Sequence, residues 1–248
     1  MTKKTQGGNE LAGRTLLITG AGGSLGSVAA KACAAEGARV VLLDKAVARL
    51  ESLYDEIVAA GSVEPAIYPL DFTGATEMDY RELALTLEKE FGALHGLLHS
   101  AAELGVPGPL ADVDLASWQR LLHVNLTAAH LLTRALLPLL AKADHAAVVF
   151  TTDSSARQNR AYWGAYGIAK IALEALARML ADELASGGKV RVNIFAPGPV
   201  RSAIRRKSHP GENPEQSPAP EMLATHYVYL LGPASRGVTG KVIEGARP

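Results

Sequence analysis

Residues 14–44, RTLLITGAGGSLGSVAAKACAAEGARVVLLD, contain the pattern that decides the fold. Two short, mostly apolar runs stand at its ends, and a glycine-rich turn followed by an alanine-rich segment separates them. Short apolar runs on either side of a segment of helical length are typical of a strand, a helix and a second strand. The stretch therefore predicts one β-α-β unit with parallel strands.

The same alternation of apolar runs and amphipathic segments continues to residue 196. Further strands are predicted at 66–71, 93–100, 146–152 and 190–196, and helices at 47–60, 78–91, 117–143 and 164–185. Strands that are apolar almost throughout are buried on both faces, as in parallel sheets covered by helices on both sides. We therefore expect the α/β class, with a single domain over residues 1–248 and a doubly wound parallel sheet.

Two segments fall outside this alternation. Residues 1–12 carry no periodic pattern, and we expect them to be a disordered N-terminus. Residues 201–220 include a polar run with four prolines, which breaks helix and strand periodicity. We expect this second segment to be a loop that covers the substrate.

The composition excludes several classes of function. Basic and acidic residues number 25 each, so the net charge is zero and no basic footprint for nucleic acid exists. No apolar run approaches the ~20 residues of a membrane span, and the N-terminus lacks the apolar core of a signal peptide. A single cysteine, Cys33, rules out a disulfide within the chain. We expect a cytoplasmic protein that acts on a small molecule.

The glycine-rich turn after the first predicted strand has the form of a phosphate-binding loop. Gly20, Gly22, Gly23 and Gly26 let the backbone turn tightly and approach a pyrophosphate, which then meets the positive end of the next helix. An ordinary strand-to-helix turn would also use glycines. The strand before it, the helix after it and the later acidic residue favour dinucleotide binding in a Rossmann fold.

Asp44 ends the second predicted strand and bears on the choice of dinucleotide. A carboxylate here accepts hydrogen bonds from both adenosine ribose hydroxyls and repels a 2′-phosphate, which favours NAD. The neighbouring Lys45 could instead attract that phosphate, so NADP is the alternative cofactor. Asp44 could also cap the helix at 47–60, and the two roles are compatible.

Tyr166 and Lys170 form a Tyr-x-x-x-Lys pair in the stretch VVFTTDSSARQNRAYWGAYGIAK at 148–170. With this pair and the phosphate loop, the chain resembles the classical short-chain dehydrogenase/reductase family over nearly its whole length. Within that family, LLHSAAELG, LTRALLPLL, VVFTT and RAYWGAYGIAK look most like an uncharacterised group of bacterial oxidoreductases. The resemblance implies an oxidoreductase that moves hydride between a nicotinamide cofactor and a secondary alcohol or ketone.

The resemblance also implies individual site residues. Asn125 of HVNLTAAH would bind a water that links Lys170 to solvent, and a buried asparagine satisfied by backbone groups is the alternative. Trp163 and Arg157 either line the substrate pocket or pack at the surface. Beyond the four glycines, Asp44 and Lys45, cofactor contacts are expected from Ser24, Leu25, Asp71, Phe72, Ser100, Ala101, Tyr166, Lys170, Pro197, Gly198 and Val200.

The chemistry of the pair follows from its spacing. Tyr166 and Lys170 are four residues apart and therefore share one face of the predicted helix. A free tyrosine has a pKa of about 10, and a nearby ammonium lowers it. We expect Lys170 to lower the pKa of Tyr166, so that the phenol works as a general acid or base. By the resemblance, Lys170 also holds the nicotinamide ribose.

Asp153 stands thirteen residues before Tyr166, where the family carries a serine that holds the substrate carbonyl. An ionised carboxylate there would repel a developing alkoxide and disfavour the Tyr166 phenolate, whereas a protonated carboxyl could donate to the carbonyl. Ser154 could take the serine's part after a one-residue shift of the loop. The alternative to an enzyme is a non-catalytic nucleotide-binding protein whose active site has decayed at Asp153.

Metal content and assembly are also predicted. No histidine has the spacing of a metal site with cysteines or carboxylates, so no metal is expected. The helices at 117–143 and 164–185 have more apolar surface than one face of a sheet covers. The family pairs these helices between subunits, and we expect a homodimer or homotetramer.

Overall fold

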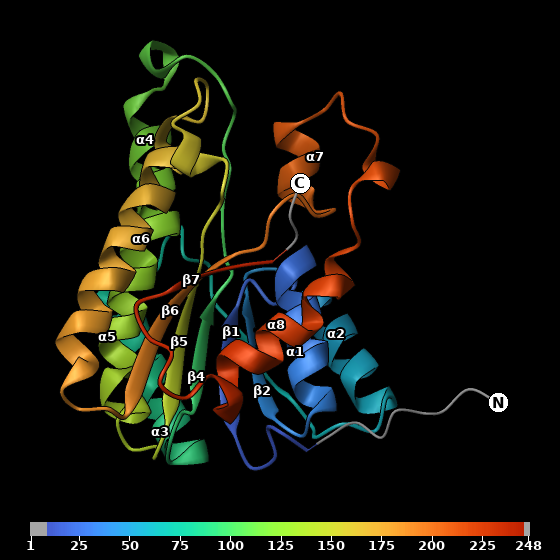
Figure 1. Cartoon of the computed structure of the whole chain (residues 1–248), viewed down its shortest axis with the longest axis vertical. Coiled ribbons are helices and arrows are strands. Elements are labelled where there is room, and N and C mark those ends of the chain that lie inside the picture. The colour runs from blue at the N-terminus through green and yellow to red at the C-terminus, as the bar shows by residue number, and fades with distance from the viewer. Residues whose placement is uncertain (1–8, 246–248) are drawn as a thin grey trace.

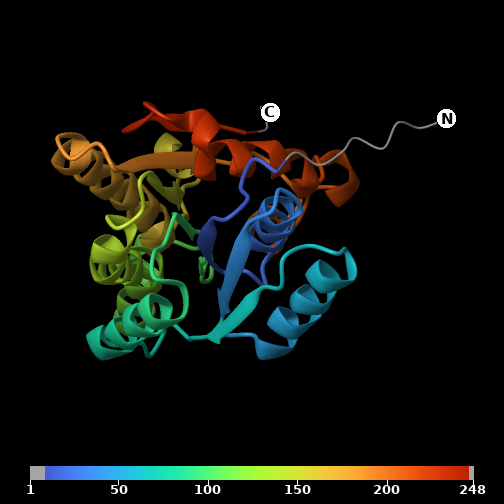
Figure 2. The same cartoon turned by 90° about the horizontal axis from the view of Figure 1, so that it is seen from below.

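A computed structural model describes residues 9–245 of the chain. One sheet of seven parallel strands runs through the middle, and helices cover both of its faces (Figure 1). The view from below shows the two layers of helices on either side of the sheet (Figure 2). The predicted α/β class, with a doubly wound parallel sheet in a single domain, is confirmed.

Strands and helices alternate along the chain. The strands are β1 (Thr15–Thr19), β2 (Arg39–Asp44), β3 (Ala66–Pro69), β4 (Gly96–His99), β5 (Ala146–Thr151), β6 (Val190–Ala196) and β7 (Val242–Glu244). The helices are α1 (Ser24–Ala35), α2 (Val47–Ala59), α3 (Glu77–Phe91), α4 (Leu115–Leu122), α5 (Ala128–Leu140), α6 (Gly164–Ala185), α7 (Ala203–Ser208) and α8 (Ala224–Leu231). The sequence does not predict α7, α8 and β7, because each is too short to show a clear period.

The strands pair in the order β3-β2-β1-β4-β5-β6-β7, so the chain leaves β3 and continues on the other side of β1. All pairs are parallel, and Ile18 of β1 aligns with Leu42 of β2 and with Leu98 of β4. The connections after β1 and β4 therefore diverge at the carboxyl end of the sheet. Such a point in a doubly wound sheet opens a crevice that holds ligands.

Successive strand residues face opposite helical layers, which explains why the strands are apolar throughout. In β1, Leu17 packs in the core shared with α3, α5 and α6, whereas Leu16 and Ile18 pack with α1, α2 and α8. All three side chains are fully buried. A strand with both faces buried needs no polar side, as the parallel arrangement predicts. Within the described range, no helix is both long and apolar enough to cross a bilayer.

The helix predicted over 117–143 is interrupted. A π-helical turn at His123–Thr127 separates α4 from α5. The side chain of Asn125 in this turn donates from Nδ2 to the Leu121 carbonyl oxygen at 2.8 Å. This bond occupies an acceptor that the regular helix would use, which accounts for the wider turn. Turns of this kind are frequent at functional sites.

The N-terminal segment enters the core. Leu11 is fully buried, and its N–H donates to the Glu36 carbonyl oxygen at 2.9 Å. The prediction of disorder is therefore wrong for residues 9–12, because burial of Leu11 fixes the chain there. Residues 1–8, the remainder of that prediction, lie outside the described part of the chain.

The segment 201–220 is partly helical rather than a plain loop. Ser202 caps α7, because its Oγ accepts from the N–H of Arg205 at 3.1 Å. A further short 3₁₀ turn forms at Pro214–Gln216. The prolines therefore do not prevent helical turns in this segment, and Pro214 begins one of them. Its predicted role as a cover for the substrate stays a prediction.

Candidate active site

A cavity of about 560 Å³ opens at the carboxyl ends of β1, β4, β5 and β6. α7 stands over this end of the sheet (Figure 1). The walls come from the glycine-rich turn, the ends of β2 and β4, the start of α6 and the loop after β6. The position is the crevice at which the strand order reverses, and the size suits a small-molecule site.

Two glycines of the turn after β1 are required by backbone geometry. Gly20 has a φ of +65°, and a Cβ there would lie 2.7 Å from the Cα of Ala101. A Cβ on Gly26 would overlap the carbonyl oxygen of Gly20. These glycines let the turn lie against the segment after β4 and let α1 start directly behind it.

The N-terminus of α1 faces the cavity without a side-chain cap. Gly23 is the cap residue, and no side chain accepts from the first turn of the helix. Ser24 and Leu25, the next two residues, line the cavity. Unpaired N–H groups at the positive end of a helix dipole bind anions. This cradle fits the pyrophosphate of a dinucleotide.

The carboxylate of Asp44 is tied to the phosphate loop. Its Oδ2 accepts from the Gly22 N–H at 3.1 Å, and its Oδ1 accepts from the Ala46 N–H at 3.0 Å. Ala46 is the cap residue of α2, so Asp44 shapes the entry to that helix without being its cap. Lys45 and Arg49 line the cavity beside it. Two cations thus lie beside the Asp44 carboxylate at the predicted adenosine end.

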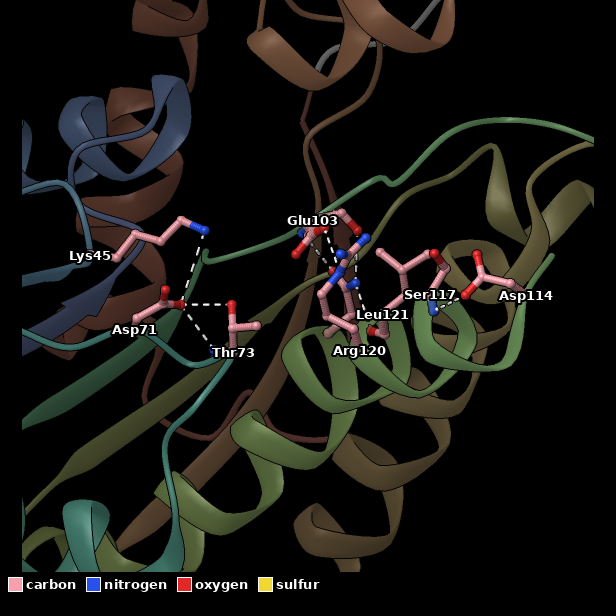
Figure 3. A network of polar contacts seen from close by, with 9 residues as sticks. Lys45, Asp71, Thr73, Glu103, Asp114, Ser117, Arg120 and Leu121 are labelled. Atoms are coloured by element: carbon pink, nitrogen blue, oxygen red, sulfur yellow. Dashed lines mark hydrogen bonds and ion pairs between the residues drawn. The ribbon is translucent and has the colours of Figure 1, made fainter.

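Figure 3 shows the polar contacts of Asp71 beyond β3. Asp71 Oδ1 accepts from the N–H and the hydroxyl of Thr73 at 2.9 and 2.8 Å, and Lys45 Nζ lies 4.0 Å from the same oxygen. The bond from the Thr73 N–H is the largest cause that lowers the pKa of Asp71. Phe72 lines the cavity, but its ring is buried edge-on against Tyr80 at 5.9 Å.

The remaining predicted cofactor residues line the same cavity; they are Ser100, Ala101, Pro197, Gly198 and Val200. The N–H groups of Ser100 and Ala101 both donate to Thr19 Oγ1, at 3.1 and 3.2 Å, which fixes the segment after β4 against β1. Ser24 Oγ accepts from the Ala203 N–H at 3.3 Å. The phosphate loop is thereby linked to the start of α7.

Asp153, Tyr166 and Lys170 come together where β5 ends and α6 begins. The Tyr166 hydroxyl donates to Asp153 Oδ2 at 3.1 Å, and the Ser155 N–H donates to Asp153 Oδ1 at 2.8 Å. Lys170 Nζ donates to the Thr151 carbonyl oxygen at 3.0 Å and lies 5.6 Å from the centre of the Tyr166 ring. Tyr166 and Lys170 are both buried.

The pKa of Tyr166 moves against the expectation. Burial, and then the carboxylate of Asp153, raise the pKa of Tyr166 well above its ordinary value. Burial lowers the pKa of Lys170 to about 8, and Asp153 opposes this shift. The predicted lowering of the Tyr166 pKa by Lys170 is therefore wrong, because the phenol is desolvated and faces a carboxylate. Asp153 raises the pKa of Tyr166, which is the direction expected from the predicted repulsion between its carboxylate and a Tyr166 phenolate.

Comparison with known proteins gives the family. A family model described as short chain dehydrogenase matches residues 14–213, which include the phosphate loop, Asp153, Tyr166 and Lys170. The chain is a short chain dehydrogenase. It therefore belongs to a family of oxidoreductases that use nicotinamide dinucleotides, as the resemblance of its motifs predicted.

Similar proteins cover nearly the whole dehydrogenase. The uncharacterised oxidoreductase YciK of Escherichia coli K12 is 36% identical over 231 residues, 93% of this chain and 91% of YciK. A structure from Pseudomonas syringae, assigned to the short chain dehydrogenases, is 43% identical with a TM-score of 0.93 and covers 98% and 99% of the chains. One from Shigella flexneri, complexed with NADP, is 35% identical with a TM-score of 0.92 and covers 95% and 98%. The predicted likeness to an uncharacterised bacterial group is confirmed.

Asp153, and not Ser154, contacts Tyr166 in this dehydrogenase. Ser154 lines the cavity, but the contact with Tyr166 comes from the residue before it. Thr152 Oγ1 donates to Glu174 Oε1 at 2.7 Å, which anchors the loop directly before Asp153. The one-residue shift considered for this loop is therefore not observed.

Glu174 in the middle of α6 is a functional candidate that the sequence does not reveal. It is buried, and besides Thr152 it binds Arg157 Nε at 2.7 Å and Arg178 Nη2 at 3.1 Å. Arg157 also lies 3.6 Å from Glu244. Arg157 therefore helps to hold the loop that carries Asp153 through its contact with Glu174. Trp163 lines the cavity, whereas Arg157 does not. A lone Glu within a helical pattern carries no signal of such a role.

Asn125 is satisfied by backbone groups. Its Oδ1 accepts from the Glu103 N–H at 3.1 Å, and its Nδ2 donates to the carbonyl oxygens of Glu103 and Leu121, each at 2.8 Å. Glu103 is further held by Arg120, whose Nε lies 3.1 Å from Glu103 Oε1 (Figure 3). The Asn125 side chain thus connects the cavity wall at Glu103 to α4. This is the alternative considered for Asn125, a buried asparagine satisfied by backbone groups. The water relay to Lys170 stays a prediction.

His99 is the last residue of β4 and is buried. Its Nε2 lies 2.8 Å from Thr133 Oγ1, and that hydroxyl donates to the Ala129 carbonyl oxygen, so Nε2 is the donor to Thr133. Burial, and then Lys170, lower the pKa of His99 to about 3, which keeps the ring neutral. Among residues 9–245, no three His, Cys, Asp or Glu side chains gather as a metal site requires.

α7 and the turn after it supply a cavity wall that the sequence does not predict. Arg205 pairs with Glu212 at 2.7 Å, and the His209 ring lies 6.1 Å from that of Trp163. The polar, proline-rich composition marks this segment as irregular but does not say which side chains turn inward. The wall residues from this segment are Ala203, Ile204, Arg205, Ser208, His209 and Glu212.

Proposed function

We propose that this short chain dehydrogenase transfers a hydride between a nicotinamide dinucleotide and a small molecule, with secondary alcohols and ketones as the substrates expected from the family. One observation carries the proposal: Tyr166 and Lys170 open into the same cavity as the uncapped N-terminus of α1. When bound, the cofactor gives or takes the hydride. The chain holds both partners and places a proton donor beside the reacting carbon.

Tyr166 and Lys170 have separate tasks at the reacting end. Lys170, fixed by its bond to Thr151, is placed to donate to the nicotinamide ribose hydroxyls. Burial and Asp153 raise the pKa of Tyr166, so the phenol keeps its proton and is placed as a hydrogen-bond donor to the substrate heteroatom. Reduction is the direction that these groups favour.

We propose NADP(H) as the cofactor in place of the NAD expected from Asp44. Lys45 and Arg49 line the adenosine end, and both are cations that suit a 2′-phosphate. The oxygens of Asp44 already accept from the Gly22 and Ala46 N–H groups. The similar protein from Shigella flexneri is complexed with NADP. NAD is the alternative.

Calorimetric titration with NADPH and NADH distinguishes the two cofactors. We expect NADPH to bind more tightly, and Lys45→Ala and Arg49→Ala each to weaken NADPH about tenfold, or 1.4 kcal/mol, with little effect on NADH. Lys31→Ala is the control, because Lys31 pairs with Glu56 on the surface. Tighter binding of NADH by the wild type would contradict the proposal and support NAD as the cofactor, as expected from Asp44.

Tyr166→Phe tests the hydride transfer itself. We expect turnover of a ketone panel, followed by nicotinamide absorbance, to fall by roughly 10²–10⁴-fold while cofactor affinity stays within about twofold. Unchanged turnover would place the proton donor elsewhere. A wild-type protein that binds cofactor but reduces neither the ketones nor an imine would favour the non-catalytic alternative.

We also propose the predicted homodimer or homotetramer. Ile168, Ile171 and Met179 on α6 and Leu115 on α4 are exposed apolar side chains. Exposed apolar side chains that gather on two neighbouring helices mark a surface suited to association. The cytoplasmic location stays a prediction.

A further inference from the structure

The reacting end of the cavity holds a carboxylate where the family has a neutral hydroxyl. Asp153 Oδ1 accepts from the Ser155 N–H at 2.8 Å, and Oδ2 accepts from the Tyr166 hydroxyl at 3.1 Å. A carboxyl group whose two oxygens both accept has the arrangement of its charged form. A fixed negative charge therefore stands beside the hydroxyl that meets the substrate.

Apart from Lys170, the other charged groups on the substrate side of the cavity are paired or exposed and do not neutralise the charge of Asp153. The remaining charged groups on the substrate side are the pairs Arg205–Glu212 and Glu103–Arg120 and the exposed Arg160. Lys170 is the cation that shares the reacting end with Asp153. Together these two groups have a net charge of zero, whereas a serine at 153 would leave the reacting end with the positive charge of Lys170 alone.

A reacting end of zero net charge suits a ketone poorly. Ketone reduction builds negative charge on oxygen, which an uncompensated Lys170 would stabilise. The Tyr166 phenolate left by proton donation is also disfavoured, because burial and Asp153 raise the pKa of Tyr166. Neither effect opposes a substrate that carries a positive charge from the start.

Aromatic rings complete surroundings that suit an organic cation. Trp163 lines the cavity, and its ring centre lies 5.7 Å from that of Tyr166 and 6.1 Å from that of His209. The faces of tryptophan and tyrosine rings attract cations, most strongly where water is excluded. A carboxylate next to two such rings binds a cation better than a neutral molecule of the same shape.

Resting on the proposed hydride transfer, we propose that the substrate is an imine that reacts as its protonated iminium cation, with Asp153 as the counter-ion. The iminium carbon gains the hydride of the reduced cofactor, and the C=N π pair moves onto nitrogen. The positive charge on nitrogen is neutralised as the cofactor becomes oxidised, and the product is a neutral amine. No proton has to leave Tyr166, which holds the Asp153 carboxylate by its hydrogen bond.

Binding to the protein saturated with NADP⁺ tests the charge preference without turnover. The probes are tetrahydroisoquinoline, an ammonium ion at neutral pH, and isochroman, its neutral oxygen analogue. We expect the wild type to bind the ammonium at least about tenfold more tightly, and Asp153→Asn to remove this preference. Glu88→Gln, which removes an exposed carboxylate outside the cavity, should keep it. Equal affinity of the wild type for both probes would overturn the proposal.

Turnover with NADPH separates this proposal from the proposed function. We expect wild-type protein to reduce the imine dihydroisoquinoline faster than the ketone tetralone, and Asp153→Ser to shift the ratio toward the ketone at least about tenfold. A wild type that prefers the ketone, at a ratio unchanged in Asp153→Ser, overturns the imine assignment and leaves hydride transfer intact. If neither compound is reduced by either protein, the hydride transfer and the imine assignment both fail.

Discussion

Replacing Glu174 by glutamine should destabilise the protein and loosen the loop that carries Asp153. The Glu174 side chain is only 6% exposed. Its Oε1 accepts from Thr152 Oγ1 and Arg157 Nε at 2.7 Å each, and its Oε2 lies 3.1 Å from Arg178 Nη2. Glutamine keeps the volume but removes the charge and turns one acceptor oxygen into a donor, which then faces another donor.

The expected cost follows from the burial of the two partners. Removing one partner of a buried ion pair costs about 3–5 kcal/mol when the other charge is left uncompensated. Here Arg178 is 52% exposed and Arg157 keeps Glu244 at 3.6 Å, so both guanidinium groups retain other stabilisation. We therefore expect a loss of about 2–3 kcal/mol in the free energy of unfolding. In a domain of this size, that corresponds to a fall in Tm of roughly 4–12 °C.

Glu77→Gln is the matched control. Glu77 also pairs with two arginines, Arg81 at 2.8 Å and Arg134 at 2.7 Å, but its side chain is 48% exposed. Exposed pairs contribute little to stability, so urea unfolding should show a much smaller loss for this variant than for Glu174→Gln. Equal losses in Glu77→Gln and Glu174→Gln would refute the reasoning, because burial would then make no difference.

The remaining predictions concern the phosphate loop, the buried lysine and the exposed face of α6. Gly26→Ala should abolish cofactor binding in calorimetry, since a Cβ overlaps the Gly20 carbonyl oxygen; near-normal affinity would show that the loop yields. The pKa of Lys170 is lowered from 10.5 to about 8, so the unfolded chain binds more protons between these values. Unfolding free energy should therefore rise from about pH 8 to 10, by up to about 1.4 kcal/mol per unit, and Lys170→Met should flatten that rise. Ile171→Glu should lower the native mass measured by light scattering; an unchanged mass would exclude this face from the interface.

The order of strands and helices as far as β6, and the phosphate loop, could be predicted from the sequence. β1 and β2 are contiguous apolar runs, and glycines lie between them. Both features are local, so the pattern of apolar residues and the position of the glycines reveal them directly. Gly20 and Gly26 are needed for steric reasons that involve close neighbours in the chain or the adjoining strand. The identity of Tyr166 and Lys170 as a pair also follows from spacing on one helix, because four residues make about one turn.

Whether Asp153 or Ser154 contacts Tyr166 was left open by the sequence and was decided only by the tertiary structure. Its contact with Tyr166 depends on the loop anchored through Thr152 to Glu174, which lies 22 residues further along the chain. The same holds for Asn125, whose partner Glu103 comes from the loop after β4. Local patterns encode which residues form strands and helices, whereas desolvation and hydrogen-bond partners depend on groups that only the folded chain brings together. The raised pKa of Tyr166 is therefore a property of the packed site, because its burial and the neighbouring carboxylate do not exist in the unfolded sequence.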